Sequence, residues 1–145
     1  MNETIEMLEF IYKTADMGSN SSSDLMMALK DKDNKIKKEL ETINKKYEYF
    51  KNESFKLLKK QKQDPQTAGL MANVMSKMSI KKEVQKDNSD SSMADMLIQG
   101  LNMGNLDIEK RISNFEKQID KKVLNLAKEF KKFGEDYIEI LKSYL

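Results

Sequence analysis

The side chains of this chain that could most readily take part in chemistry are its eleven methionines. Met71, Met75 and Met78 recur at a spacing that places them on one face of a helix. Soft thioether sulfurs can bind Cu(I). Such copper sites usually also contain Cys or His, and the chain has neither. The sequence therefore favours packing of these methionines within the protein, ahead of a groove for a partner and well ahead of a metal site.

The absence of cysteine and histidine excludes several classes of site at once. Disulfides, the usual zinc sites, cysteine nucleophiles and histidine-based triads all need one of these residues. The sequence also has no glycine-rich phosphate loop and no nucleophile elbow. The tyrosines lie mostly on or near apolar stripes, where packing accounts for them. These observations predict no catalytic residue and no cofactor, and they argue against an enzyme.

The charge distribution argues against a nucleic-acid partner. The net charge is +2, and the lysines alternate with Glu and Asp as on solvated helix faces. Arg111 is the single arginine, although arginine is the better residue for bidentate phosphate binding. The start of the chain, MNETIEMLEF, is acidic rather than basic, unlike a signal peptide, and no stretch is apolar enough to span a membrane. A cytoplasmic location is the resulting expectation.

Apolar residues at helical spacing predict four long helices, at about 2–29, 34–61, 90–115 and 120–144. The second pattern is the clearest, and its stripe consists of Ile36, Leu40, Ile43, Tyr47, Phe50, Ser54 and Leu57. The serine tract GSNSSSD at 18–24 could break the first helix into two pieces. The sequence favours a continuous helix with a face of small residues.

Helix start signals precede these segments. Asn2 and Asp33 are residue types that cap helix N-termini, and each directly precedes an apolar stripe. The stretch from Ser92 to Asp95 has the form of a capping box, and a start near Ser89 also fits. The sequence therefore predicts Asn2 and Asp33 as N-caps of the first and second helices.

The lengths of the connections predict the topology. Short joins around Asp31 and Lys117 make each flanking pair of helices an antiparallel hairpin. The segment at about 64–88 is far longer than a hairpin needs. It contains one short amphipathic piece, formed by Leu70, Met71, Val74, Met75 and Met78. Such a crossover can return along the whole bundle and leave the second and third helices parallel. The predicted fold is all-α: a four-helix bundle of two antiparallel hairpins in one domain, 1–145, with a partly helical crossover.

Three glycines, Gly18, Gly100 and Gly104, fall inside the first and third predicted helices, where each costs about 1 kcal/mol relative to alanine. Met17-Gly18 and Met103-Gly104 occupy similar places on the first and third helices, which suggests an internal duplication or a chance match in a lysine-rich chain. We expect Gly18, Gly100 and Gly104 to let helix backbones approach closely where the hairpins cross. Neutral drift and a membrane dimerisation motif are the other interpretations, and flanking charges disfavour the second.

Three segments resemble a known group of proteins: ADMG at 15–18, LMANVMSKM at 70–78 and, most specifically, MADMLIQGLNMG at 93–104. Together with the two-hairpin pattern, they resemble the ferritin-like superfamily, and within it a set of uncharacterised bacterial four-helix-bundle proteins of similar length. The resemblance spans nearly the whole chain as a pattern. It implies the ferritin-like fold, with a long crossover between the second and third helices.

The resemblance also raises the question of a metal site. Ferritin-like di-iron enzymes use a Glu on each of two helices and a Glu-x-x-His on each of the others. Without histidine this chain cannot build that site in its usual form. A carboxylate-only substitute would draw on Glu9, Asp16, Glu39, Glu53, Asp95 and Glu129. These residues border the apolar stripes and do not interrupt them, so the sequence favours solvated carboxylates.

Two functional hypotheses follow from the sequence. The leading one is a non-enzymatic ferritin-like bundle that acts through protein–protein contacts, with a homodimer as its expected form and an unidentified protein partner. The alternative is a degenerate ferritin-like protein that holds iron or manganese with carboxylates alone. A weaker third idea is a helix-hairpin adaptor with an exposed apolar stripe on 70–78, which would exceed several hundred Å².

Overall fold

The computed structural model describes residues 2–67 and 69–145, and of Leu70 and Met71 it describes only the backbone. These residues form helices and no strand, so the predicted all-α class is confirmed. The elements in chain order are α1 (Glu3–Ala28), α2 (Lys37–Lys60), α3 (Leu70–Lys86), α4 (Asp90–Phe115) and α5 (Lys121–Lys142).

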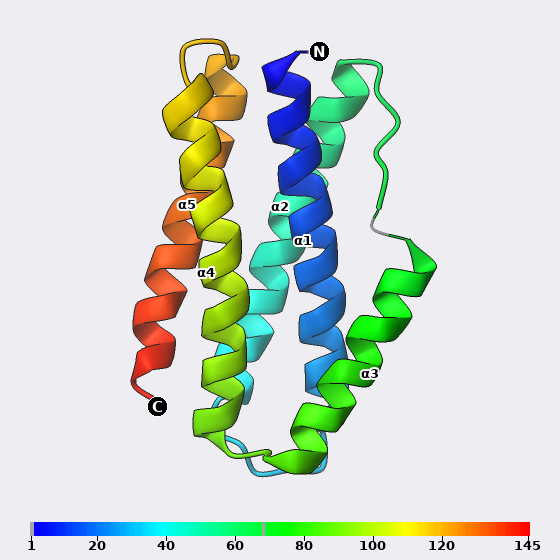
Figure 1. The fold of residues 1–145 in the computed structure, drawn as a ribbon, viewed down its shortest axis with the longest axis vertical. Helices are drawn as coiled ribbons and strands as arrows, with labels where there is room; N and C mark the ends of the chain where they lie inside the picture. Colours follow the sequence, from blue (N-terminus) through cyan, green and yellow to red (C-terminus); the bar gives the residue numbers. More distant parts are fainter. Residues whose placement is uncertain (1, 68) are drawn as a thin grey trace.

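The four long helices lie side by side, and α3 runs obliquely along the outside of α1 (Figure 1). The pairs α1–α2 and α4–α5 are antiparallel hairpins, as the short connections predict. The chain returns along the molecule through α3, so α2 and α4 run in the same direction. At the end of the molecule where α1 begins, the backbone N–H of Asp120 donates a hydrogen bond of 2.9 Å to Thr4 Oγ1. This bond joins the starts of α1 and α5.

The core lies between the two hairpins and is built from the predicted apolar stripes. The largest side chains that are fully buried are Met7, Leu8, Ile11, Leu25, Leu29, Ile36, Leu40, Ile43, Leu58, Met93, Ile108 and Leu141. Aromatic rings bridge α2 and α5 in the middle of the molecule. The Phe50 and Phe130 ring centroids are 5.1 Å apart, and those of Tyr47 and Phe133 are 5.2 Å apart, both nearly edge to face. Such edge-to-face pairs add stabilisation beyond the buried area.

The helix starts confirm the predicted cap at Asn2 and the alternative start near Ser89, and they correct the predicted cap at Asp33. Asn2 caps α1, because its side chain accepts a hydrogen bond from the Thr4 backbone N–H. Asp33 does not cap α2, whose cap position is Ile36 and has no side-chain cap of its own. The Ser92–Asp95 stretch lies inside α4, because Ser89 accepts from the Ser92 N–H and starts the helix a turn earlier.

A residue from the other hairpin performs the capping that Asp33 was predicted to do. Asp90 accepts hydrogen bonds from the backbone N–H groups of Lys35 (3.1 Å) and Ile36 (3.4 Å) and from the Asn34 side chain (2.9 Å). Its carboxylate therefore satisfies donors at the start of α2 and complements the positive end of that helix dipole. This contact ties the start of α4 to the start of α2.

Asp90→Ala is expected to lower the free energy of unfolding by about 1–2 kcal/mol, because it removes a helix cap supplied across the two hairpins. Urea denaturation followed by circular dichroism measures the change. Asp95→Ala is the matched control, since Asp95 is exposed on the same helix and accepts only from Gln99. Equal losses in the two variants would contradict the capping role.

The serine tract at 18–24 continues α1 without a break, as the sequence favoured. Ser19 and Ser22 are buried, and Ser22 Oγ donates back to the Gly18 carbonyl at 2.7 Å. From α2, the Asn44 side-chain amide donates to the Ser19 carbonyl at 3.0 Å and to Ser22 Oγ at 2.8 Å. These bonds give partners to the buried hydroxyl of Ser22 and to the amide of Asn44.

α3 corrects the prediction that its methionines pack within the protein. Val74, Met75 and Met78 are exposed, and Met71 lies outside the residues whose side chains are described. α3 turns other residues toward α1: Ile80 and Val84 are buried, and polar contacts join Asn20 to Asn73 and Ser21 to Ser76. The face of α3 that meets α1 therefore combines two apolar side chains with small polar ones, which match the serine tract of α1.

Across residues 2–67 and 69–145, no helix combines the length and the apolar character needed to cross a membrane.

Candidate functional site

A groove of about 530 Å³ separates α1 from α4, with α3 forming its third wall. We call it the α1–α4 groove. Its walls are mainly Phe10, Thr14, Met17, Gly18 and Ser21 on α1, Met96, Leu97, Gly100, Met103, Gly104 and Asp107 on α4, and Ser76, Ser79, Ile80 and Glu83 on α3. On α4 the wall residues recur at helical spacing, as one continuous face. This face comes from the segment that carries the resemblance most specifically.

The two Met-Gly pairs noted in the sequence line this one groove from opposite walls. Met17 is 45% exposed and Met103 is 74% exposed, so both thioethers are open to solvent. Methionine is flexible and polarizable, which suits a surface that must adapt to a bound partner. The fold thus brings together two exposed apolar side chains that are far apart in the sequence.

The three glycines singled out in the sequence have different surroundings. A Cβ added at Gly18 would lie 2.5 Å from the Tyr47 ring, so α1 and its own hairpin partner α2 meet there. At Gly104 an added Cβ would be 3.6 Å from Thr14 Cγ2 on α1, which is ordinary contact. At Gly100 no described atom lies within 4 Å. Gly18 therefore makes room for an aromatic ring, and Gly100 leaves the groove wide.

Gly134 on α5, which the sequence did not single out, also has a close neighbour. A Cβ there would be 2.1 Å from the Oδ1 of Asn105, a buried residue of α4. The Asn105 side-chain amide donates to the Lys131 carbonyl at 3.1 Å. This contact between α4 and α5 is the counterpart, in the second hairpin, of the Gly18–Tyr47 contact in the first.

Acidic groups lie at the edges of the α1–α4 groove. Glu83 comes from α3 and Asp107 from α4, and both are exposed. Arg111 donates to Asp107 at 3.2 Å, and its guanidinium lies 4.6 Å from the centroid of the Phe10 ring. The arginine thus closes one end of the groove, while Glu83 lies on the opposite wall.

α3 carries a second apolar feature on its outer surface. Val74, Met75 and Met78 share a face of this helix that is turned away from α1, and we call them the methionine strip. Lys81 and Lys82 continue this side of the helix and are exposed. The strip and the groove lie on neighbouring sides of α3, because Ser79 and Glu83 face the groove.

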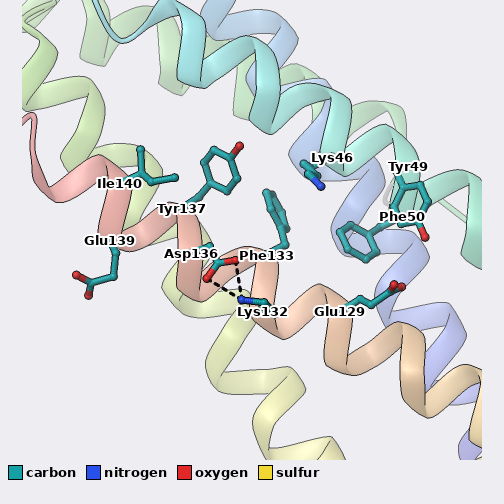
Figure 2. Close-up of a pocket in the computed structure, with 10 residues that line it drawn as sticks. All are labelled: Lys46, Tyr49, Phe50, Glu129, Lys132, Phe133, Asp136, Tyr137, Glu139 and Ile140. Atoms are coloured by element: carbon teal, nitrogen blue, oxygen red, sulfur yellow. Dashed lines mark hydrogen bonds and ion pairs between the residues drawn. The ribbon is translucent and has the colours of Figure 1, made fainter.

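A separate cleft of about 720 Å³ lies between α2 and α5 (Figure 2). It is lined by Lys46, Tyr49, Phe50, Glu129, Lys132, Phe133, Asp136, Tyr137, Glu139 and Ile140. Phe50 and Phe133 form a buried aromatic floor. Lys132 pairs with Asp136 at 3.1 Å, on the outer side of α5. Burial and the nearby negative charge of Glu129 raise the pKa of Tyr49. The cleft is thus an aromatic seam between the hairpins whose charges largely satisfy one another.

One predicted carboxylate, Asp16, is buried. Its side chain pairs with Lys51 Nζ at 3.0 Å, and its second oxygen, Oδ2, has no hydrogen-bond partner among the described residues. Burial disfavours the charged form of Lys51, but hydrogen bonding and the charge of Asp16 outweigh it and raise the pKa of Lys51. One turn along α1, Ser19 donates to Glu48 of α2. The ammonium of Lys51 therefore supplies the positive charge that this buried carboxylate requires.

The other predicted carboxylates have partners or surroundings different from those of Asp16. Glu39 accepts a hydrogen bond from Tyr144, and Asp95 accepts one from Gln99. Glu53 pairs with Lys56. Glu129 lines the α2–α5 cleft, and Glu9 is half-buried on α1. The bond to Glu39 raises the pKa of Tyr144 to about 12. In the part of the chain that the structure describes, no three carboxylates come together in a way that could hold a metal ion.

Several residues of these sites were missed by the sequence analysis, and the signal for some of them was present. Lys51 and Asp16 lie equally far from the turn at Asp33-Asn34, and so do Glu48 and Ser19. In an antiparallel helical hairpin, residues equally far from the turn lie at the same height. A predicted hairpin with that turn therefore pairs these residues, whereas nothing in the sequence alone pairs Asp90 with the start of α2.

Comparison with known proteins leaves these sites to be interpreted from their own chemistry, because no family model, no curated protein and no solved structure matches the chain.

Proposed function

We propose that this protein is a non-enzymatic four-helix bundle with a ferritin-like crossover that acts through protein–protein contacts. The observation that carries the proposal is the α1–α4 groove, where Met17 and Met103 are exposed on facing walls and Gly100 leaves open space. A helix-in-groove contact uses this kind of surface: an apolar trough that accepts the apolar face of one amphipathic helix.

The occupant that we propose for the groove is α3 of a second copy of the chain. The methionine strip of α3 is an apolar helix face without a partner in its own copy. Lys81 and Lys82 accompany the strip, and the exposed carboxylate of Glu83 borders the groove, where Asp107 is already paired with Arg111. Attraction between these lysines and Glu83 of the other copy favours the association.

A two-fold symmetric dimer makes this contact twice, because each copy then offers its strip to the groove of the other. Doubling matters for the size of the interface. A stable interface buries about 1,200–2,000 Å² in total, which is more than one short helix face contributes. With both strips and both grooves engaged, the exposed methionines of α3 and of the groove walls all leave the solvent together.

The experiment pairs two variants with opposite charges. Met103→Lys places a positive charge in the groove, and Met75→Glu places a negative charge on the strip. Each variant alone is expected to weaken the dimer at least tenfold, since a charge is then buried against an apolar surface. An equimolar mixture is expected to restore the dimer as a heterodimer, because the new lysine and glutamate then face each other. Sedimentation velocity over a range of micromolar concentrations measures both effects.

Met27→Lys is the matched control, because Met27 is exposed on α1 but belongs neither to the groove nor to the strip. Its dimer is expected to be as stable as that of the unaltered protein. An unaltered protein that stays monomeric throughout the concentration range would overturn the proposal. So would a dimer that both charged variants leave intact, since the contact would then lie on another surface.

A further inference from the structure

We propose that the exposed methionines of the groove and the strip are a site of oxidation by peroxide, and that their oxidation holds the protein in its monomeric form. The second part rests on the proposed function, because it needs the dimer. The first part stands on exposure and on the chemistry of the chain alone.

The methionines of the contact surface and those of the core differ widely in exposure. In the groove Met103 is 74% exposed, and on the strip Met75 is 64% exposed. In the core Met7 is 1% exposed and Met93 is fully buried. Because the chain has no cysteine, no thiolate competes for an oxidant, and the thioethers are its most oxidisable groups. Peroxide therefore reaches the contact surface before it reaches the core.

The reaction needs no catalyst and no group that the protein lacks. Hydrogen peroxide transfers one oxygen atom to the thioether sulfur of Met103, whose lone pair forms the new S–O bond. The O–O bond breaks, and the other oxygen leaves as water after it receives the proton. The sulfur is oxidised by two electrons, the peroxide is reduced by two electrons, and the product is methionine sulfoxide.

The sulfoxide changes what the groove can bind. It replaces an apolar, flexible side chain by a polar one whose oxygen accepts hydrogen bonds. In the dimer this oxygen would lie against Phe10, Leu97 and the partner's methionine strip, whose apolar side chains donate no hydrogen bond to it. We expect the dissociation constant of the dimer to rise at least tenfold when Met103 and Met75 are oxidised.

Dimer formation and oxidation then compete for the same side chains. In the dimer the groove and strip methionines are covered, so their oxidation is expected to slow as protein concentration rises. Met27 is 63% exposed and lies in neither surface, so its rate is expected not to depend on concentration. If exposure alone set the oxidation rates, the rates of Met103 and Met27 would respond to protein concentration in the same way.

The experiment treats the full-length protein with limiting hydrogen peroxide at several protein concentrations and measures sulfoxide at each methionine by peptide mass spectrometry. We expect Met103 and Met75 to react at least tenfold faster than Met7 and Met93 in dilute protein, and to be protected in concentrated protein. Sedimentation velocity of the oxidised sample is expected to show monomer. A variant that combines Met17→Leu, Met75→Leu, Met78→Leu and Met103→Leu is expected to remain dimeric after the same treatment, because leucine keeps the apolar contact and has no sulfur to oxidise.

The outcomes separate this inference from the proposed function. A protein that dimerises when concentrated, but whose Met103 and Met75 react no faster than Met7 when it is dilute, overturns the oxidation site and leaves the dimer standing. A protein that is monomeric before treatment, but oxidised at Met103 and Met75, overturns the dimer and the control of association while supporting the oxidation site. A dimer that persists with both methionines fully oxidised overturns the inference that oxidation controls association.

Discussion

Lys51→Met is expected to lower the free energy of unfolding by about 3 kcal/mol, the lower end of the range for breaking a buried ion pair. The reason is Asp16, which is 3% exposed and has Lys51 as its cationic partner at 3.0 Å. Without the ammonium, the carboxylate must stay charged without a counterion or take up a proton. The lower end applies because the Lys51 side chain is still 29% exposed, so water screens part of the interaction.

The double variant Asp16→Leu with Lys51→Met tests this reason directly. Replacing both partners of a buried pair by apolar residues of similar size is often neutral or stabilising. We therefore expect the double variant to recover most of the stability that Lys51→Met loses, as measured by urea denaturation. If the double variant is as unstable as the single one, the loss comes from packing of the lysine stem and not from the unpaired carboxylate.

Gly18→Ala is expected to lower the free energy of unfolding by about 1–3 kcal/mol, as overpacking in a well-filled core does. The added Cβ would lie 2.5 Å from the Tyr47 ring. That ring cannot move aside easily, because it is buried and packs edge-on against Phe133 at 5.2 Å. The gain in helix propensity of about 1 kcal/mol offsets only part of the strain.

Gly100→Ala is the matched control, because the same substitution meets no described atom within 4 Å. There the helix-propensity gain acts alone, and we expect stability to rise by about 0.5–1 kcal/mol. Thermal denaturation of the two variants in parallel measures both changes. Effects of the same sign at Gly18 and Gly100 would contradict the assignment of Gly18 to a close contact and Gly100 to open space.

Much of the architecture could be predicted from the sequence, because it depends on local patterns. The stripe from Ile36 to Leu57 identified α2, and short joins identified the two hairpins. The crossover was predicted from its length alone. What failed depends on contacts between distant segments: the cap of α2 comes from Asp90 on the other hairpin, not from Asp33. No local pattern reports on such a partner.

The candidate site was harder to predict than the fold for a physical reason. The apolar pattern of 70–78 shows that one face of α3 is apolar, but it does not show whether that face meets the bundle or solvent. In the structure Ile80 and Val84 are buried, Asn73 and Ser76 contact Asn20 and Ser21 of α1, and Met75 and Met78 are left outside. The sequence shows that Met17 and Met103 are each followed by a glycine at similar places in their helices. It does not show that the two methionines line one groove.

The crossover through α3 has a consequence for how the chain folds. α1 packs more on its neighbour α2 than on any other helix, and α4 packs mostly on α5. Such local contacts form quickly and with a small loss of chain entropy. We therefore expect each hairpin to form first and the two hairpins to dock afterwards. In that order of events α3 and the connection before it act as a tether between the two hairpins. The length of the tether sets how often the hairpins meet, and it does not change the contacts that they make with each other.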